Sequence, residues 1–319
     1  MQTAGEAIIA RDGATHDSFR RYAWGVLGYI MFVVLWGAFV RATSSGAGCG
    51  GHWPLCNGDV VPRAPTLATL IEYTHRLTSG LSLCGVAALW IWSRREFPRG
   101  HRARRMAMLS VVFLVVEALL GAGLVLFDYV AQNASIGRAL YLALHLANTQ
   151  VLLGVLALTA LLAGRGEEPF RLRSVPTSVL ATLPLVVALS MTGAVAALGD
   201  TLFPASSVAA GIRQELAGTA HFLLRLRVLH PVLAVATGFC LLWAASSLVR
   251  ARPSAGVKQA AAAVAALVLA QLAAGAVNIA LLAPVWMQLV HLLLADALWI
   301  ALVVAAARAA LAPVPQTVR

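Results

Sequence analysis

The chain has 319 residues, of which 60% are hydrophobic and 12% charged, and 24 Lys+Arg against 13 Asp+Glu give a formal net charge of +11. An ordinary soluble domain has about 25% charged residues, so this chain has too little polar surface to cover itself in water. The same composition excludes intrinsic disorder and a collagen-like fibre. A nucleic-acid partner would require the basic residues to line one water-facing surface. The basic residues instead lie at the ends of apolar stretches, which excludes a nucleic-acid partner.

Eight continuous apolar stretches are each long enough to cross about 30 Å of hydrocarbon as a helix of about 20 residues. Continuous rather than alternating apolar runs favour helices over the strands of a membrane barrel. The sequence therefore predicts an all-α integral membrane protein with eight transmembrane helices in a lipid bilayer. The predicted spans are 22–40, 67–92, 104–127, 138–163, 175–198, 220–249, 257–282 and 284–311.

The basic residues are divided unequally between the two ends of these spans. Seventeen of the 24 Lys+Arg lie in the N-terminal segment, the C-terminal segment or the loops after even-numbered spans, six lie at the opposite ends, and Arg76 lies within a span. Because cytoplasmic loops carry an excess of Lys and Arg, both termini are predicted to be cytoplasmic in a bacterial-type plasma membrane. Residues 1–21 and 312–319 are then cytoplasmic tails, and the polar start followed by a full span does not resemble a cleaved signal peptide.

The two halves of the chain resemble each other. Rare residues recur at offsets of 156 to 154 residues in the first three spans of each half, and at 146 in the last. Residues 22–163 and 175–311 are therefore predicted to form two tandem four-helix bundles related by a parallel repeat. The corresponding pairs are Gly37 and Gly193, His75 and His230, Glu117 and Gln271, Gly121 and Gly275, and His145 and His291.

Four histidines, His75, His145, His230 and His291, lie inside even-numbered spans. Each is about 7–9 residues from the predicted outer end of its span, or roughly 10–14 Å deep. A neutral imidazole is an axial ligand of heme iron, and two on facing helices can hold one macrocycle. The pattern predicts His75 with His145 in the first half and His230 with His291 in the second. Hydrogen bonds to helix carbonyls, a proton relay and non-heme metal binding are the alternatives.

An acidic residue distinguishes the first pair. Glu72 is three residues before His75, one turn nearer the outer surface, so it can accept protons or orient water beside a ligand held by His75. A salt bridge to Arg76 is the alternative. This asymmetry between the halves suggests one reactive site and one electron-transfer site.

The second half carries basic residues at the matching place. Arg227 is three residues before His230, and Arg225 and Arg227 are placed to contact heme propionates. Two further acids lie within spans. Glu117 is expected to pack or to form hydrogen bonds, and no role is assigned to Asp296.

The first outer loop contains two cysteines, Cys49 and Cys56, separated by glycines and a proline. They face the oxidising side of the membrane, so they are expected to form a disulfide, either structural or redox-active. Zinc binding by these two cysteines and His52 is an alternative that lacks a fourth ligand.

The loop 48–58 (Gly-Cys-Gly-Gly-His-Trp-Pro-Leu-Cys-Asn-Gly) followed by Ile-Glu-Tyr-Thr-His-Arg at 71–76 resembles the heme A synthase family. The resemblance covers nearly all of the span region. It implies oxidation of the C8 methyl group of heme O to a formyl group, by successive hydroxylation and dehydration, which gives heme A for terminal oxidases. One departure is that the loop 199–219 has no cysteines, whereas some members of the family carry a second pair there.

The resemblance also implies roles for individual residues. His75 and His145 match the ligands of the substrate heme O, and Glu72 matches the family's catalytic acid. His230 and His291 match the axial ligands of a bound heme b, which relays electrons. Cys49 and Cys56 match the pair in the outer loop. A heme O synthase is an expected partner, whereas the electron donor and a homo-oligomeric state are left open.

Three other functions compete with this interpretation. A membrane b-type cytochrome or quinol oxidoreductase would use the same four histidines without needing Glu72 or the cysteine loop. A proton-coupled transporter would use the histidines and acids as a relay. A heme O prenyltransferase is disfavoured because the sequence has no paired acidic motif for binding a diphosphate through magnesium.

Overall fold

The computed structural model describes residues 4–164 and 170–311, and within those residues the chain forms nine α-helices and no strand. The predicted all-α fold is confirmed for this part of the chain. The helices are α1 (Ala4–Ala42), α2 (Leu67–Glu96), α3 (Arg102–Leu126), α4 (Ile136–Ala163), α5 (Thr177–Leu202), α6 (Val208–Leu216), α7 (Phe222–Ala251), α8 (Ala255–Ala280) and α9 (Val285–Leu311).

Seven of these helices are long and apolar enough to cross a membrane, namely α1 from His16 onward, α3, α4, α5, α7, α8 and α9. They coincide with seven of the eight predicted spans. Helix α2 begins at the predicted residue and has 30 residues, but its first half carries polar side chains such as Glu72 and Arg76 and it is not among the seven. Membrane crossing by α2 therefore stays a prediction.

Hydroxyl side chains determine where four of the helices begin. The first amides of a helix have no partner within the helix, and an N-cap oxygen accepts a hydrogen bond from one of them. The starts of α2, α4 and α8 lie within two residues of the predicted starts because these caps are local. The accepting side chains, each with the residue whose backbone amide donates to it, are Thr66 (Thr69), Ser135 (Arg138), Ser207 (Ala210) and Ser254 (Val257).

Two elements differ from the prediction. Helix α1 begins at Ala4, so it includes most of the segment 1–21 that the sequence predicts as a tail. Alanine, glutamate and arginine are good helix formers, so this segment has helical propensity without an apolar run. Helix α6 is a helix of nine residues in the predicted loop between the fifth and sixth spans. The predicted tail 312–319 lies outside the described residues.

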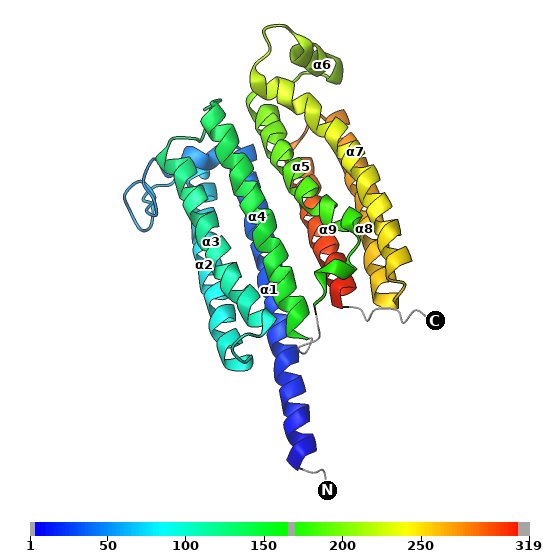
Figure 1. Cartoon of the computed structure of the whole chain (residues 1–319). Helices are drawn as coiled ribbons and strands as arrows, with labels where there is room; N and C mark the ends of the chain where they lie inside the picture. The colour runs from blue at the N-terminus through cyan, green and yellow to red at the C-terminus, as the bar shows by residue number, and fades with distance from the viewer. Residues whose placement is uncertain (1–3, 165–169, 312–319) are drawn as a thin grey trace.

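Figure 1 shows the long helices in two groups, one of α1, α2, α3 and α4 and one of α5, α7, α8 and α9. In the first group, α1 and α3 each pack against both α2 and α4; in the second, α5 and α8 each pack against both α7 and α9. Helices α2 and α4 are therefore diagonal to each other, as are α7 and α9. Helix α1 begins and α9 ends at one end of the molecule, called the inner end below. Helix α6 and the loop between α1 and α2 lie at the opposite, outer end.

The two groups meet where α1 and α4 pack against α5 and α9, and one apolar core continues across this boundary. At its centre the side-chain amide of Gln150 donates to Asp296 Oδ1 at 3.0 Å, and the Trp299 indole donates to the Gln150 carbonyl. Asp296 is fully buried. A polar group without water needs a partner inside the protein, so this pair holds α4 and α9 in one register.

Arg41 makes a second polar connection between the groups. From α1 it donates to the Ala197 carbonyl at 2.7 Å and to Thr201 Oγ1 at 2.8 Å, both on α5, and to Gln288 Oε1 on α9 at 2.9 Å. One guanidinium thus connects three helices from both groups. A planar group with several fixed donors suits this role better than an ammonium.

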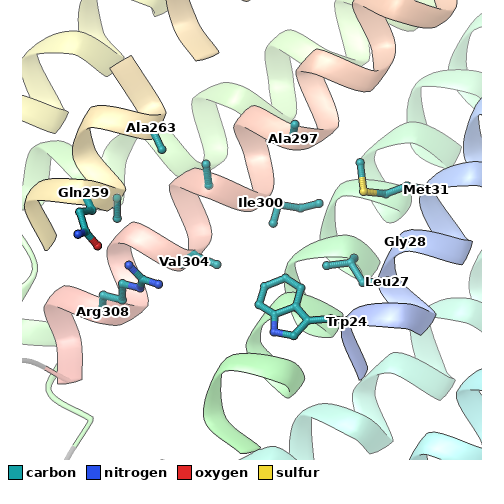
Figure 2. A pocket seen from close by; sticks show the side chains of 12 residues that line it. Trp24, Leu27, Gly28, Met31, Gln259, Ala263, Ala297, Ile300, Val304 and Arg308 are labelled. Carbon is teal, nitrogen blue, oxygen red and sulfur yellow. The ribbon is translucent and has the colours of Figure 1, made fainter. Parts of the chain in front are cut away.

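A cavity of about 450 Å³ lies between α1, α8 and α9. Its walls are mostly apolar, including Trp24, Met31 and Ile300, and Gln259 and Arg308 stand on the side of α8 and the end of α9 (Figure 2). None of His75, His145, His230 and His291 lines this cavity.

Replacing Arg41 by alanine should loosen the contact between the two groups. The substitution removes three hydrogen bonds from a charged donor. We expect the free energy of unfolding in detergent to fall by about 1–3 kcal/mol, because bonds to charged groups contribute about that much each and part is recovered by water. Thermal unfolding followed by tryptophan fluorescence measures the change.

Arg63→Ala is the matched control, since this side chain is 90% exposed in the outer loop. Equal unfolding temperatures for the Arg41 variant, the Arg63 variant and the unmodified chain would contradict the assigned role of Arg41.

Candidate functional site

Each of the four predicted histidines lies against a glycine of a neighbouring helix. A Cβ atom at Gly37, Gly193 or Gly275 would come so close to the imidazole ring that the ring would have to shift, whereas one at Gly121 would make an ordinary van der Waals contact. The same pairing occurs twice in each group of helices. The distances from such a Cβ are 3.0 Å from Gly37 to His75 Cε1, 3.7 Å from Gly121 to His145 Nε2, 3.0 Å from Gly193 to His230 Cε1, and 3.2 Å from Gly275 to His291 Cε1.

In the second group, His230 on α7 and His291 on α9 face each other across the bundle. Their ring centroids are 6.5 Å apart and the ring planes are nearly perpendicular, at 88°. His230 Nδ1 lies 2.9 Å from Thr192 Oγ1, and His291 Nε2 lies 3.2 Å from the side-chain nitrogen of Gln271. The structure therefore brings together the two histidines that the sequence pairs in this half.

In the first group, His145 is in contact with an acid. Its Nδ1 lies 3.1 Å from Glu117 Oε1, although the ring N–H does not point directly along the line between the two atoms. Asn148 Nδ2 donates to the other carboxylate oxygen at 2.6 Å, and the Thr149 hydroxyl donates to Oε1. Glu117 thus does form the hydrogen bonds expected of it. His75 occupies the diagonal helix α2.

The chemistry of these side chains suits a metal held between two imidazoles. The Nδ1 atoms of His75 and His291 are buried without a hydrogen-bond partner among the described residues, which is costly in an apolar interior unless a ligand or water compensates. Within residues 4–164 and 170–311, no group of three or more His, Cys, Asp or Glu side chains is arranged to hold a metal. Imidazole pairs in an apolar bundle are the donor set of a bis-histidine heme.

Cys49 and Cys56 form a disulfide, as predicted, and both are almost fully buried. The loop that contains them lies directly on the start of α2. A Cβ at Gly48 would be 2.5 Å from the Ala68 backbone, so only glycine fits there. The Thr69 hydroxyl donates to the Gly48 carbonyl at 2.9 Å and fixes this contact.

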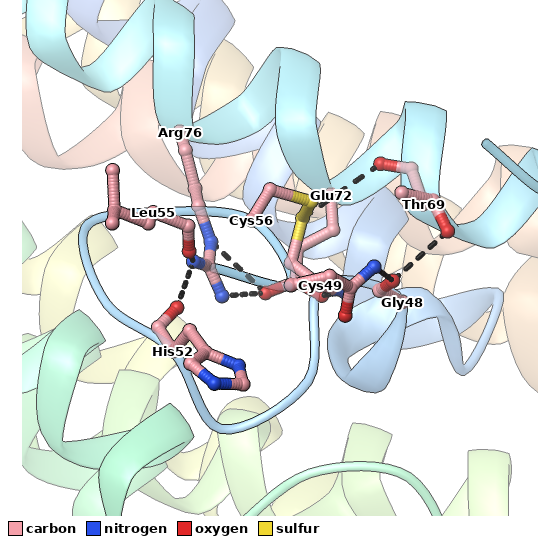
Figure 3. Close-up of polar contacts among 9 residues, drawn as sticks. Gly48, Cys49, His52, Leu55, Cys56, Thr69, Glu72 and Arg76 are labelled. Carbon is pink, nitrogen blue, oxygen red and sulfur yellow. Dashed lines mark hydrogen bonds and ion pairs between the residues drawn. A yellow bond between two sulfur atoms is a disulfide. The ribbon is translucent and has the colours of Figure 1, made fainter. Parts of the chain in front are cut away.

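Glu72 connects this loop to α2 (Figure 3). The side chain is 3% exposed, and its Oε2 accepts a hydrogen bond from the Cys49 amide at 2.8 Å. Its Oε1 forms a salt bridge with Arg76 at 2.5 Å. Arg76 also donates to the carbonyls of His52 and Leu55 within the disulfide loop. The salt bridge that the sequence offers as an alternative is therefore present, while the catalytic role of Glu72 stays a prediction.

The two arginines predicted to contact propionates already have partners. Arg227 lies 3.1 Å from Asp200 and 2.5 Å from Glu215 of α6, and Arg225 donates to the Gly218 carbonyl at 2.6 Å. Arg227 therefore anchors α6 to the outer ends of α5 and α7. The propionate role of both arginines stays a prediction.

Sequence reasoning missed several polar partners of the histidines. Asn148 and Thr149 follow His145 by three and four residues, a spacing that places all three on one face of α4. The sequence therefore contained a pattern from which their position beside His145 could have been predicted. Thr192 lies beside His230 only because α5 and α7 pack together, and no local pattern predicts that contact.

The chain matches a known protein family over most of its length. A model of the COX15-CtaA family, described as cytochrome oxidase assembly protein, matches residues 20–303. The chain therefore belongs to the COX15-CtaA family, and the resemblance to heme A synthases is confirmed.

Individual relatives support this assignment. A protein of Thermus thermophilus named protoheme IX farnesyltransferase is 51% identical over 282 residues, which cover 88% of this chain and 46% of the relative. A heme A synthase of Halalkalibacterium halodurans is 39% identical over 140 residues, 44% of each chain. One from Bacillus licheniformis is 44% identical over 116 residues, 36% of this chain and 35% of the relative. The chain thus spans less than half the length of each of these relatives.

Replacing Arg76 by alanine should release the disulfide loop. The loop carbonyls of His52 and Leu55 lose their shared donor, and Glu72 loses its counter-ion. Arg63 is the single trypsin site between Arg41 and Arg76. We expect cleavage there to become about 10–100-fold faster, because losing roughly 1.5–3 kcal/mol of charged hydrogen bonding raises the population of the open loop.

Gel analysis of a trypsin time course measures the rate. Arg94→Ala is the control, since this exposed arginine is at the other end of α2. A cleavage rate unchanged by the Arg76 substitution would show that the loop is held by the disulfide and Gly48 alone.

Proposed function

We propose that the protein converts heme O to heme A by oxidising the C8 methyl group to a formyl group. The observation that carries the proposal is the arrangement of four histidines in two diagonal pairs, each ring against a glycine. Membership of the COX15-CtaA family and relatives named heme A synthase support the same activity.

The two pairs serve different hemes in this proposal. His75 and His145 hold the substrate, heme O, and His230 and His291 hold a heme b that relays electrons. Their surroundings support the division, because the first pair has the acids Glu72 and Glu117 nearby, whereas His230 and His291 contact a threonine and a glutamine. Proton transfer requires titratable groups near the reacting atoms, and in the first pair Glu117 lies directly against His145.

The residues of the first group bind, orient and shield the substrate. Bound heme iron, together with an oxidant and a source of oxygen from outside the chain, would supply the chemistry of two successive hydroxylations of the methyl group, and loss of water would then leave the formyl group. His75 and His145 fix the plane of the porphyrin, and the apolar faces of the surrounding helices accommodate its ring. Glu72, one turn above His75, is placed to accept a proton or to orient water at the outer side of the ring. The disulfide loop covers this end of the site.

We also propose that all eight long helices cross the membrane and that residues 22–163 and 175–311 are tandem repeats. Both groups have the same order of helix packing and the same glycine–histidine pairs. Most of the basic residues lie in segments such as the α2–α3 and α7–α8 connections. Figure 1 shows these two connections at the inner end. The positive-inside rule then places the inner end in the cytoplasm of a bacterial-type cell.

A heme O synthase is the partner we propose. The Thermus thermophilus relative carries the name protoheme IX farnesyltransferase, and a chain like this one accounts for 46% of it. A synthase-like region joined to a farnesyltransferase would pass a poorly soluble heme over a short distance. The electron donor is left unassigned.

Expression of the full chain with heme O supplied should yield heme A. Mass spectrometry of extracted pigment detects the product, in which one oxygen replaces two hydrogens of the methyl group. A chain that binds only heme b and rapidly oxidises a quinol would instead be a b-type cytochrome. A chain that binds no heme after reconstitution would support the transporter.

Replacing Glu72 by glutamine should separate chemistry from loop anchoring. Glutamine can still accept the Cys49 hydrogen bond, but it cannot take up a proton as a carboxylate does. We expect bound heme to be retained and heme A formation to fall by about 10²–10⁴-fold, the range for loss of a general acid or base. Pigment analysis measures both quantities.

The trypsin assay described above is the control for the loop. Loss of activity and faster cleavage at Arg63 are compared in Glu72→Gln and in Arg76→Ala. If the two variants show the same ratio of lost activity to faster cleavage, then Glu72 is an anchor of the loop and not a proton carrier.

A further inference from the structure

The last long helix of each group, α4 in the first and α9 in the second, carries one of the four histidines, and the two histidines have partners of different charge. His145 on α4 lies beside the carboxylate of Glu117, whereas His291 on α9 lies beside the neutral amide of Gln271. The two partners occupy equivalent places on α3 and α8, four residues before Gly121 and Gly275 respectively. The glycine–histidine packing is the same, but the partners differ by one formal charge and contact different ring nitrogens, Nδ1 of His145 and Nε2 of His291.

The carboxylate of Glu117 is held in place from several sides. Its Oε1 receives the Thr149 hydroxyl and lies 3.1 Å from His145 Nδ1, and its Oε2 receives Asn148 Nδ2 at 2.6 Å. Asn148 is itself fixed by a 2.9 Å hydrogen bond to the Phe113 carbonyl. Such a network is built for a charged acceptor, because each donor is directed at a carboxylate oxygen.

Gln271 has no comparable support. Its side-chain nitrogen lies 3.2 Å from His291 Nε2, and its side-chain oxygen is buried without a hydrogen-bond partner among the described residues. Residues 294 and 295, which correspond to Asn148 and Thr149, are leucine and alanine. The second group therefore offers its histidine a weakly held, neutral partner.

A carboxylate behind a ligating imidazole has two effects on a bound metal. It fixes the tautomer that carries the proton on Nδ1, which leaves the Nε2 lone pair for the metal, and it makes the imidazole a stronger donor. A stronger axial donor stabilises the oxidised iron and lowers its reduction potential. A neutral amide does much less, because it carries no net charge.

We propose that Glu117 is a positioning residue that acts through His145 to make it the stronger axial ligand, so that the iron in the first group has a lower reduction potential than the iron in the second. This inference rests on the proposed function, since it requires heme iron at both pairs. Gln271 contacts Nε2 of His291 and carries no charge, so it gives that histidine no carboxylate support, and the second iron stays easier to reduce and suited to receive electrons from a donor.

The test is a reciprocal exchange in the full-length protein, purified in detergent and loaded with iron protoporphyrin IX as the probe. The variants are Glu117→Gln and Gln271→Glu, and reduction potentials are measured by optical titration at the Soret band. Glu117→Gln should shift the low-potential component upward and weaken heme retention at that site by about 10–100-fold, the usual loss for partners of ligating histidines. Gln271→Glu should shift the high-potential component downward.

Two outcomes would overturn the inference while leaving the proposed function intact. One is unchanged potentials in both variants with full heme content. The other is an equal shift of both components in Glu117→Gln, which a general loosening of the fold would produce. If Glu117→Gln fails to fold, Gln271→Glu decides alone, and the absence of a downward shift then refutes the inference. Failure of the unmodified chain to bind the probe would instead count against the proposed function.

Discussion

Four imidazole rings have to fit inside two bundles of helices, and close packing against glycine is what makes room for them. At Gly37 and Gly193 a Cβ atom would lie 3.0 Å from the opposite ring, closer than ordinary van der Waals contact. Any larger residue would push the histidine or separate the helices. The helix spacing, the position of each ring and the diagonal pairing of α2 with α4 and α7 with α9 all depend on these contacts.

A repeated scaffold carries chemistry that is not repeated. Glycine and histidine correspond between the groups, whereas the charged neighbours differ: Glu72 and Glu117 in the first group, Arg227 and Gln271 in the second. Because packing is determined by the glycines, the neighbours can vary without moving the rings. One group can then be adapted for reaction with protons, and the other for holding a cofactor in a fixed state.

The sequence predicts local features well and long-range contacts poorly. Seven spans, the starts of α2, α4 and α8, and the Cys49–Cys56 disulfide follow from continuous apolar runs and from the spacing of two cysteines in one loop, which are local features of the sequence. The salt bridges of Arg227 depend on α6, which sequence reasoning treats as loop. The helical start of α1 from Ala4 was missed because the prediction followed apolar runs, whereas helical propensity does not require apolar residues.

Buried polar groups that do not serve the histidines connect the two groups of helices. Gln150 bonds to Asp296 at the centre of the boundary, and Arg41 reaches α5 and α9 nearer the outer end. In an apolar environment, breaking either contact strands an unpaired polar group, which is costly. Sliding or separation of the groups is therefore opposed at two heights along the boundary. Electron transfer between the two proposed heme sites requires such a fixed separation, and these contacts provide it.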